Sequence, residues 1–73
     1  MQLQAGRRLA VLVNGERTET GVASLGELVA QLGFSENQVA TARNGDFVPR
    51  SARAATRLAA DDKIEIVAPR QGG

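Results

Sequence analysis

The chain has 73 residues, of which 42% are hydrophobic and 23% charged, and its formal net charge is +1. This is the composition of one small globular domain, and the near-neutral charge with only 3% aromatic residues argues against a nucleic-acid-binding protein. The sequence contains no Cys and no His, which excludes disulfides, the usual zinc ligands and the commonest catalytic bases and nucleophiles.

Two Asn-Gly pairs, Asn14-Gly15 and Asn44-Gly45, mark tight turns between short segments. A type I′ turn needs positive φ at both central positions, and Asn and Gly tolerate this conformation best. The sequence therefore predicts two β-hairpins. Their strands are expected at residues 9–13, 16–20, 39–43 and 46–50.

A helix is predicted between the hairpins, with a signal at each end. Ser24 and Glu27 have the spacing of a capping box, in which each side chain bonds the backbone of the other residue. Gly33 is placed to end the helix in the left-handed conformation, and Phe34 can then fold back onto the last turn. The apolar stripe expected to face the core consists of Leu25, Leu28, Val29 and Leu32.

The second half of the chain predicts a short turn, a crossover and one more strand. Residues 35–38 can form a short turn, and residues 51–60 an irregular or short helical crossover held by Leu58. The final strand is expected at residues 64–68, and Pro69 should end its pairing because proline has no N–H to donate.

This element order predicts an α+β fold of the β-grasp, or ubiquitin-like, class. We expect a mixed sheet of four to five strands packed on one main helix, with the final strand parallel to the first at the centre. Residues 1–69 are predicted to form the domain and residues 70–73 a flexible tail. Residues 1–8 are expected to be a ragged leader or an extension of the first strand. The predicted core consists of the helical stripe with Val11, Val13, Ile64 and Ile66.

The Gly72-Gly73 end of the chain is the candidate reactive site. A tail of five residues beyond Ala68 can reach roughly 16 Å when extended, and glycines fit a narrow channel because they lack Cβ. An α-carboxylate is ionised at neutral pH and can attack the α-phosphate of ATP. The chain would then need no catalytic residue of its own, so we expect a carrier protein and not an enzyme.

The sheet face opposite the helix is a candidate docking surface. Leu12 and Val67 are expected to point away from the helix, with Ala40 and Ala42 around them. If the first and last strands pair in parallel, these residues form one patch for a partner protein. The alternative is a set of scattered exposed apolar residues, which is normal in monomeric proteins.

The charged side chains leave two further questions. Arg43, Arg50, Arg53 and Arg57 are close in sequence, and they are either a solvated face or a surface that steers an acidic partner. Asp61 and Asp62 are too few ligands for a calcium site. No metal site is therefore predicted.

Several segments together resemble the ThiS family of thiamine-biosynthesis sulfur carriers. These are residues 44–50 (NGDFVPR), Leu58, residues 62–67 (DKIEIV) and residues 71–73 (QGG). The resemblance as a whole covers about residues 9–73. Where the family has Gly in the turn before the last strand, this chain has Asp61, which must adopt the left-handed conformation. The resemblance implies that Gly73 is the modified residue and that Gly72, Gln71 and Arg70 thread into the partner's active site.

In this family the terminal glycine is adenylated by an E1-like adenylyltransferase and converted to a thiocarboxylate, which donates sulfur to thiazole synthase. The resemblance thus implies these two enzymes as partners and ATP as a cofactor of the activating enzyme, with none bound by the chain itself. Two alternatives stay open, namely a thiocarboxylate carrier for another acceptor (molybdopterin, cysteine or a sulfur-containing natural product) and a ubiquitin-like protein modifier.

We also expect a cytoplasmic protein that is monomeric when free and binds neither nucleic acid nor membrane. No apolar run approaches the roughly 18 residues that span a bilayer. No signal-peptide core follows Met1.

Overall fold

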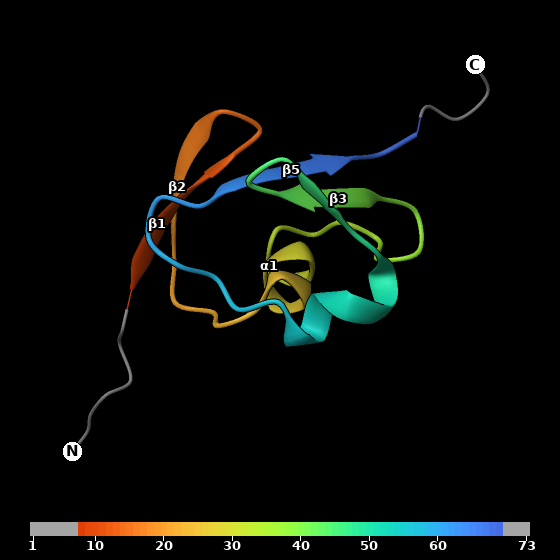
Figure 1. Cartoon of the computed structure of the whole chain (residues 1–73), viewed down its shortest axis with the longest axis horizontal. Coiled ribbons are helices and arrows are strands. Elements are labelled where there is room, and N and C mark those ends of the chain that lie inside the picture. Colours follow the sequence, from red (N-terminus) through yellow and green to blue (C-terminus); the bar gives the residue numbers. More distant parts are fainter. Residues whose placement is uncertain (1–7, 70–73) are drawn as a thin grey trace.

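A computed structural model of the chain describes residues 8–69. It contains a mixed five-stranded sheet with the two helices on one side of it (Figure 1). The elements are β1 (Leu9–Val13), β2 (Glu16–Thr20), α1 (Leu25–Gln31), β3 (Ala40–Arg43), β4 (Asp46–Val48), the 3₁₀ helix η1 (Arg50–Ala55) and β5 (Lys63–Val67). The predicted α+β class is confirmed. Within residues 8–69, no helix has the length and apolar character needed to cross a bilayer.

The strand order across the sheet is β2-β1-β5-β3-β4. The last strand β5 lies at the centre, parallel to β1 and antiparallel to β3. This confirms the predicted pairing of the first and last strands. It also means that the strand leading into the C-terminal tail has a neighbour on each side.

Both predicted hairpin turns are present, and each uses left-handed backbone. Asn14 and Asn44 each have φ of 52°, and the glycines that follow them have φ of 86° and 88°. The strands differ from expectation at their ends, since β4 stops at Val48 and β5 covers residues 63–67. The shorter β4 has a clear cause, because Pro49 cannot donate to a ladder and leads directly into η1.

The ends of α1 are fixed as the sequence predicts. Ser24 Oγ accepts a hydrogen bond of 3.1 Å from the N–H of Glu27, and Glu27 Oε1 accepts one of 3.2 Å from the N–H of Ser24. At the other end, Gly33 has φ of 85°. The N–H groups of Gly33 and Phe34 donate to the carbonyls of Ala30 and Val29, at 3.0 and 3.1 Å, which is the Schellman pattern.

The core lies between α1, η1 and the inner face of the sheet. Leu25 and Leu28 of α1 are fully buried, but Leu32, predicted as part of the same stripe, is 37% exposed. That prediction is wrong because α1 ends at Gln31 and Leu32 is only its C-cap. Phe34, returned by the Schellman turn, packs against the core. The buried apolar residues are Val11, Val13, Leu25, Leu28, Val29, Val48, Leu58, Ile64 and Ile66.

Arg53 is a structural residue and not part of a solvated basic face. It is only 4% exposed. Its guanidinium donates to Thr41 Oγ1 at 2.9 Å and to the carbonyls of Glu36 and Val39 at 2.8 and 2.7 Å. The side chain thereby ties η1 to β3 and to the segment before it, and these hydrogen bonds satisfy the buried guanidinium.

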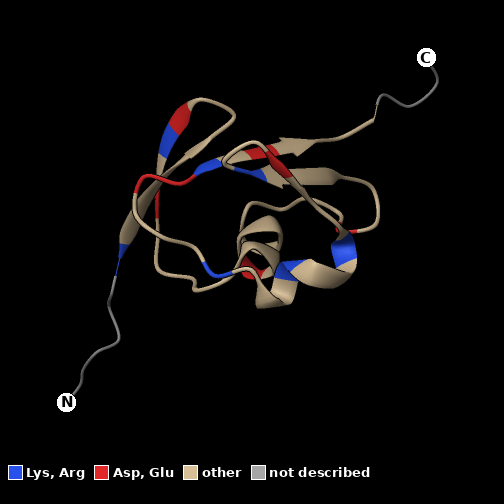
Figure 2. Cartoon of the chain, in the orientation of Figure 1, with Lys and Arg blue, Asp and Glu red and all other residues tan. Residues whose placement is uncertain are grey.

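The other three arginines of the predicted cluster differ from one another. Arg43 is half-buried and paired with Asp62 at 2.8 Å, whereas Arg50 and Arg57 are exposed. Figure 2 shows positive and negative residues distributed over the sheet and the loops. The four arginines therefore do not form one surface that could steer an acidic partner.

Candidate functional site

The predicted reactive tail follows the central strand β5 in the sequence. The last residue of β5, Val67, pairs with Ala40 of β3, and the described chain continues to Pro69. Figure 1 shows β5 in blue running to one end of the sheet. Arg70, Gln71, Gly72 and Gly73 lie outside the described residues. Their assigned roles remain predictions.

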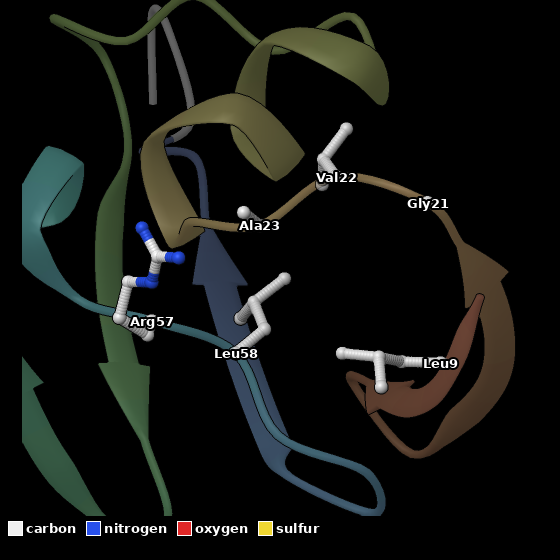
Figure 3. Close-up of a pocket in the computed structure, with 6 residues that line it drawn as sticks. All are labelled: Leu9, Gly21, Val22, Ala23, Arg57 and Leu58. Atoms are coloured by element: carbon white, nitrogen blue, oxygen red, sulfur yellow. The ribbon is translucent and has the colours of Figure 1, made fainter. Parts of the chain in front are cut away.

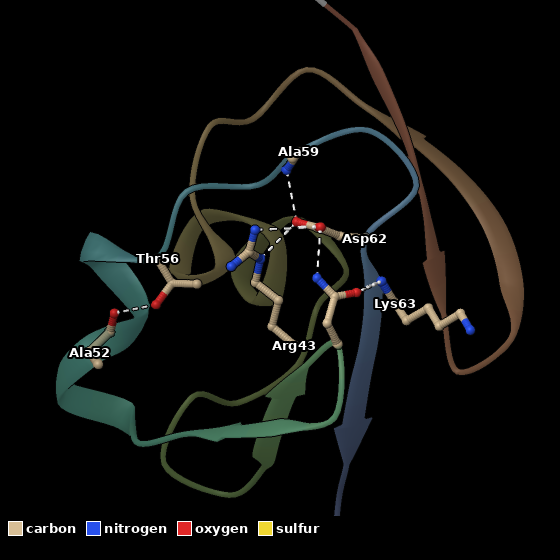
Figure 4. Close-up of polar contacts among 7 residues, drawn as sticks. Arg43, Ala52, Thr56, Ala59, Asp62 and Lys63 are labelled. Carbon is tan, nitrogen blue, oxygen red and sulfur yellow. Dashed lines mark hydrogen bonds and ion pairs between the residues drawn. The ribbon is translucent and has the colours of Figure 1, made fainter.

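The turn before β5 is held by a buried carboxylate (Figure 4). Asp62 is 5% exposed and accepts hydrogen bonds from Arg43 Nε and from the N–H of Ala59, both at 2.8 Å, and from Asn44 Nδ2 at 3.0 Å. Asp61 has φ of 70°, which confirms that it adopts the left-handed conformation expected there. Asp62 therefore joins the β3–β4 turn to the start of β5.

The same hydrogen-bond donors occupy the carboxylate oxygens of Asp62, so Asp61 and Asp62 do not form a cation site. Within residues 8–69, no group of three or more His, Cys, Asp or Glu side chains could hold a metal ion.

The hydrogen bonds of Asp62 make stability depend on pH. Burial raises the pKa of this carboxyl, but hydrogen bonds from Arg43, Asn44 and Ala59, with the charge of Arg43, lower the pKa to a net value below the usual one for Asp. A folded-state pKa below that of the unfolded chain stabilises the fold above the ordinary Asp pKa of about 4. This stabilisation is lost as the pH falls through the folded-state pKa.

We therefore expect the free energy of unfolding to decrease between about pH 5 and pH 2, and to decrease less steeply in Asp62→Asn. Urea denaturation at a series of pH values measures both slopes. Glu27, whose pKa is lowered by the backbone N–H groups of Ala23 and Ser24, is present in both proteins, so the difference isolates Asp62. Parallel profiles for the two proteins would contradict this assignment.

An apolar patch lies on the outer face of the sheet, opposite the helices. It consists of Val67 and Phe47, 60% and 70% exposed, with Ala40 and Ala42 between them. Val67 pairs with Ala40, and Phe47 pairs with Ala42. We call these four residues the outer patch.

Leu12, predicted to belong to the same surface, lies apart from the outer patch. It is half-buried and paired with Lys63 and Arg17. Lys63 precedes Val67 by four residues on β5, which is about 13 Å along a strand. The expectation of a single patch that includes Leu12 is therefore wrong, because the parallel register places Leu12 at the start of β5.

Phe47 is the surface residue that the sequence analysis missed. The signal was present in the Asn44-Gly45 turn, because a two-residue loop pairs Arg43 with Asp46 and hence Ala42 with Phe47. Residues that pair directly share a face of the sheet. Once Ala42 is placed on the outer face, Phe47 follows.

A shallow hollow on another side of the domain has a volume of about 220 Å³ (Figure 3). Its lining residues are Leu9, Gly21, Val22, Ala23, Arg57 and Leu58. It is smaller than the roughly 300–1,000 Å³ typical of small-molecule sites, and only Arg57 among its lining residues is ionisable. We assign it no chemical role.

The chain is similar to known proteins in sequence and in structure. The model of the ThiS family matches residues 11–73. A crystal structure of the thiamine biosynthesis protein ThiS from Geobacter metallireducens is 28% identical, covers 89% of this chain and 100% of that chain, and superposes with a TM-score of 0.73. A solution NMR structure of a thiamine biosynthesis protein from the same organism is 26% identical, covers 89% and 88% of the two chains, and has a TM-score of 0.74. No curated protein sequence matches significantly.

Proposed function

This chain belongs to the ThiS family of ubiquitin-like sulfur carriers, and from that premise we propose that the carboxylate of Gly73 carries the sulfur. The observation that supports this most is the family match, which extends through Gly73. The central position of β5 also supports the proposal, because a strand paired on both sides holds the start of the tail in a fixed place.

The proposed loading takes two steps on the partner enzyme. A carboxylate oxygen of Gly73 first attacks the α-phosphate of ATP, and pyrophosphate leaves to give the acyl-adenylate. A hydrosulfide-equivalent nucleophile then attacks the acyl carbon, AMP leaves, and the thiocarboxylate remains. We propose an E1-like adenylyltransferase as the enzyme of the first step and thiazole synthase as the acceptor of the sulfur.

In this scheme the chain acts as a substrate. Its own residues position the tail and bind the enzyme, and the chemical groups that activate ATP belong to the partner. Such a division of roles fits a sequence with no Cys and no His. It also fits a domain whose buried polar residues Asp62, Arg53 and Thr41 make structural hydrogen bonds.

The experiment that tests the proposal is reconstitution with a ThiS-specific adenylyltransferase. We expect carrier-dependent exchange of pyrophosphate into ATP and, after addition of sulfide and thiazole synthase with its substrates, formation of the thiazole. Exchange without thiazole formation would assign the carrier to another acceptor. No exchange would contradict the proposal.

We propose the outer patch as the docking surface for the adenylyltransferase. Phe47 and Val67 are large and exposed. Val67 is the last residue of β5, the strand that leads into the tail, and Phe47 lies on β4, beyond β3. A partner that binds here therefore lies next to the origin of the tail. Aromatic side chains at the centre of interfaces contribute a large share of the binding energy.

Phe47→Ser is expected to lower kcat/KM for adenylation about tenfold or more, as for a hot-spot aromatic residue, with little change in melting temperature. Steady-state kinetics with varied carrier concentration measures the effect. Leu32→Ser is the matched control, because Leu32 is an exposed apolar residue at the C-cap of α1, away from the outer patch. Equal kcat/KM values for the two variants would contradict the docking assignment.

A further inference from the structure

The side chain of Asn14 bonds the backbone of β5 in two directions. Asn14 Nδ2 donates to the carbonyl of Ile66 at 3.1 Å, and Asn14 Oδ1 accepts from the N–H of Ile66 at 3.0 Å. The backbone N–H of Asn14 also donates to the carbonyl of Ile64 at 2.8 Å. One turn residue thus holds two positions of the last strand.

This contact continues the β1–β5 ladder beyond the end of β1. Asp62, Ile64 and Ile66 present their backbone groups toward β1: Leu12 donates to the carbonyl of Asp62, and Asn14 to that of Ile64. At Ile66 the chain of β1 has already turned away, since that strand ends at Val13. The side-chain amide of Asn14 carries the same donor and acceptor as a peptide group, and it takes the place of the missing strand residue.

The position of this contact matters for the tail. Among residues 8–69, Ile66 is the last residue of β5 whose backbone is paired on the β1 side, and Val67, which pairs with Ala40, is the last on the β3 side. Gly73 follows Ile66 by only seven residues. If the hydrogen bonds between Asn14 and Ile66 were lost, the end of β5 would be held by β3 alone. The position from which the tail begins would then vary.

We propose that Asn14 is a positioning residue for the reaction at Gly73, acting through β5 to fix the point from which the tail extends. This inference rests on the proposed function. The side-chain amide of Asn14 keeps the end of β5 ordered before the enzyme binds. A disordered strand end would have to be ordered on binding, which weakens association.

The test compares Asn14→Gly with Asn44→Gly. Both positions have φ of 52° and precede a glycine, so glycine is accepted there without strain. Asn44 also uses its side chain on β5, accepting from the N–H of Lys63 at 2.9 Å and donating to Asp62 at 3.0 Å. These bonds lie at the start of the strand, away from the tail, so Asn44→Gly is a matched control for general loss of stability.

We expect Asn14→Gly to raise the KM of the carrier for the adenylyltransferase about fivefold with kcat unchanged, as when an interaction that acts equally on bound substrate and transition state is lost. Asn44→Gly should leave KM within about twofold of the unsubstituted protein, although it removes at least as many hydrogen bonds. Amide hydrogen exchange at Ile66 should be faster in Asn14→Gly only.

Equal KM values for the two variants would overturn the inference, and so would unchanged hydrogen exchange at Ile66 in Asn14→Gly. If the unsubstituted protein is not adenylated at all, the proposed function fails. The exchange measurement at Ile66 then still decides whether Asn14 orders the end of β5.

Discussion

Deletion of Gly73 is expected to abolish adenylation and to leave the melting temperature unchanged. The truncated chain still ends in a glycine carboxylate, that of Gly72, but the reacting group then lies one residue, about 3.5 Å, short of its place. A misplacement of 1 Å can cost about 100-fold in rate, so a loss above about 1,000-fold is expected. ATP–pyrophosphate exchange measures the loss.

Two controls make this result specific to the chain end. Thermal denaturation should give superimposable curves, because the core residues lie between Val11 and Ile66. Gly73→Ala keeps the carboxylate at the right distance and adds a Cβ, so it separates reach from channel width. An exchange rate unaltered by the deletion would contradict the proposed role of Gly73.

Leu28→Asp is expected to unfold the domain. Leu28 has no exposed surface, and the substitution both removes a packed side chain and buries a carboxylate with no partner. Loss of the side chain alone costs about 2–5 kcal/mol, and the buried charge adds to that. A domain of this size has a total stability near the lower end of the usual range of about 5–15 kcal/mol. Far-UV circular dichroism with temperature measures the outcome.

Leu32→Asp is the matched control, since Leu32 is at the end of the same helix and is 37% exposed. We expect it to fold with a melting temperature close to that of the unsubstituted protein. A native-like melting curve for Leu28→Asp would mean that α1 does not pack on the sheet through this residue.

The features that could be predicted from sequence are those set by local chemistry. The two Asn-Gly turns and the capping box at Ser24 depend on residues within a few positions of one another, and Gly33 ends the helix for a similarly local reason. The parallel pairing of β1 with β5 is a longer inference. It followed from the order of the elements, which is that of the β-grasp fold.

The features that were missed depend on partners distant in the chain. Arg53 reads as a surface cation, and its burial becomes clear only when Thr41 Oγ1 and the carbonyls of Glu36 and Val39 converge on it. The two-way contact between Asn14 and Ile66 joins residues 52 positions apart. Such contacts depend on how distant segments pack together, which no local pattern specifies.

The candidate site also combines features that local patterns predict with features that depend on distant contacts. The outer-face positions of Val67, Ala40 and Ala42 followed from alternation along the strands, whereas the separation of Leu12 from them follows from the register Leu12–Lys63. The identification of Gly73 came from the resemblance and from the chemistry of a terminal carboxylate.

The most direct test is the intact mass of the protein isolated from its native cells. If Gly73 carries sulfur, a fraction of the molecules will be heavier by the difference between one sulfur and one oxygen atom, and fragmentation will place the added mass on the last residue. Treatment with iodoacetamide should alkylate that fraction alone, since the chain has no Cys. A protein found only as the free carboxylate, or joined through Gly73 to lysines of other proteins, would contradict the sulfur-carrier mechanism.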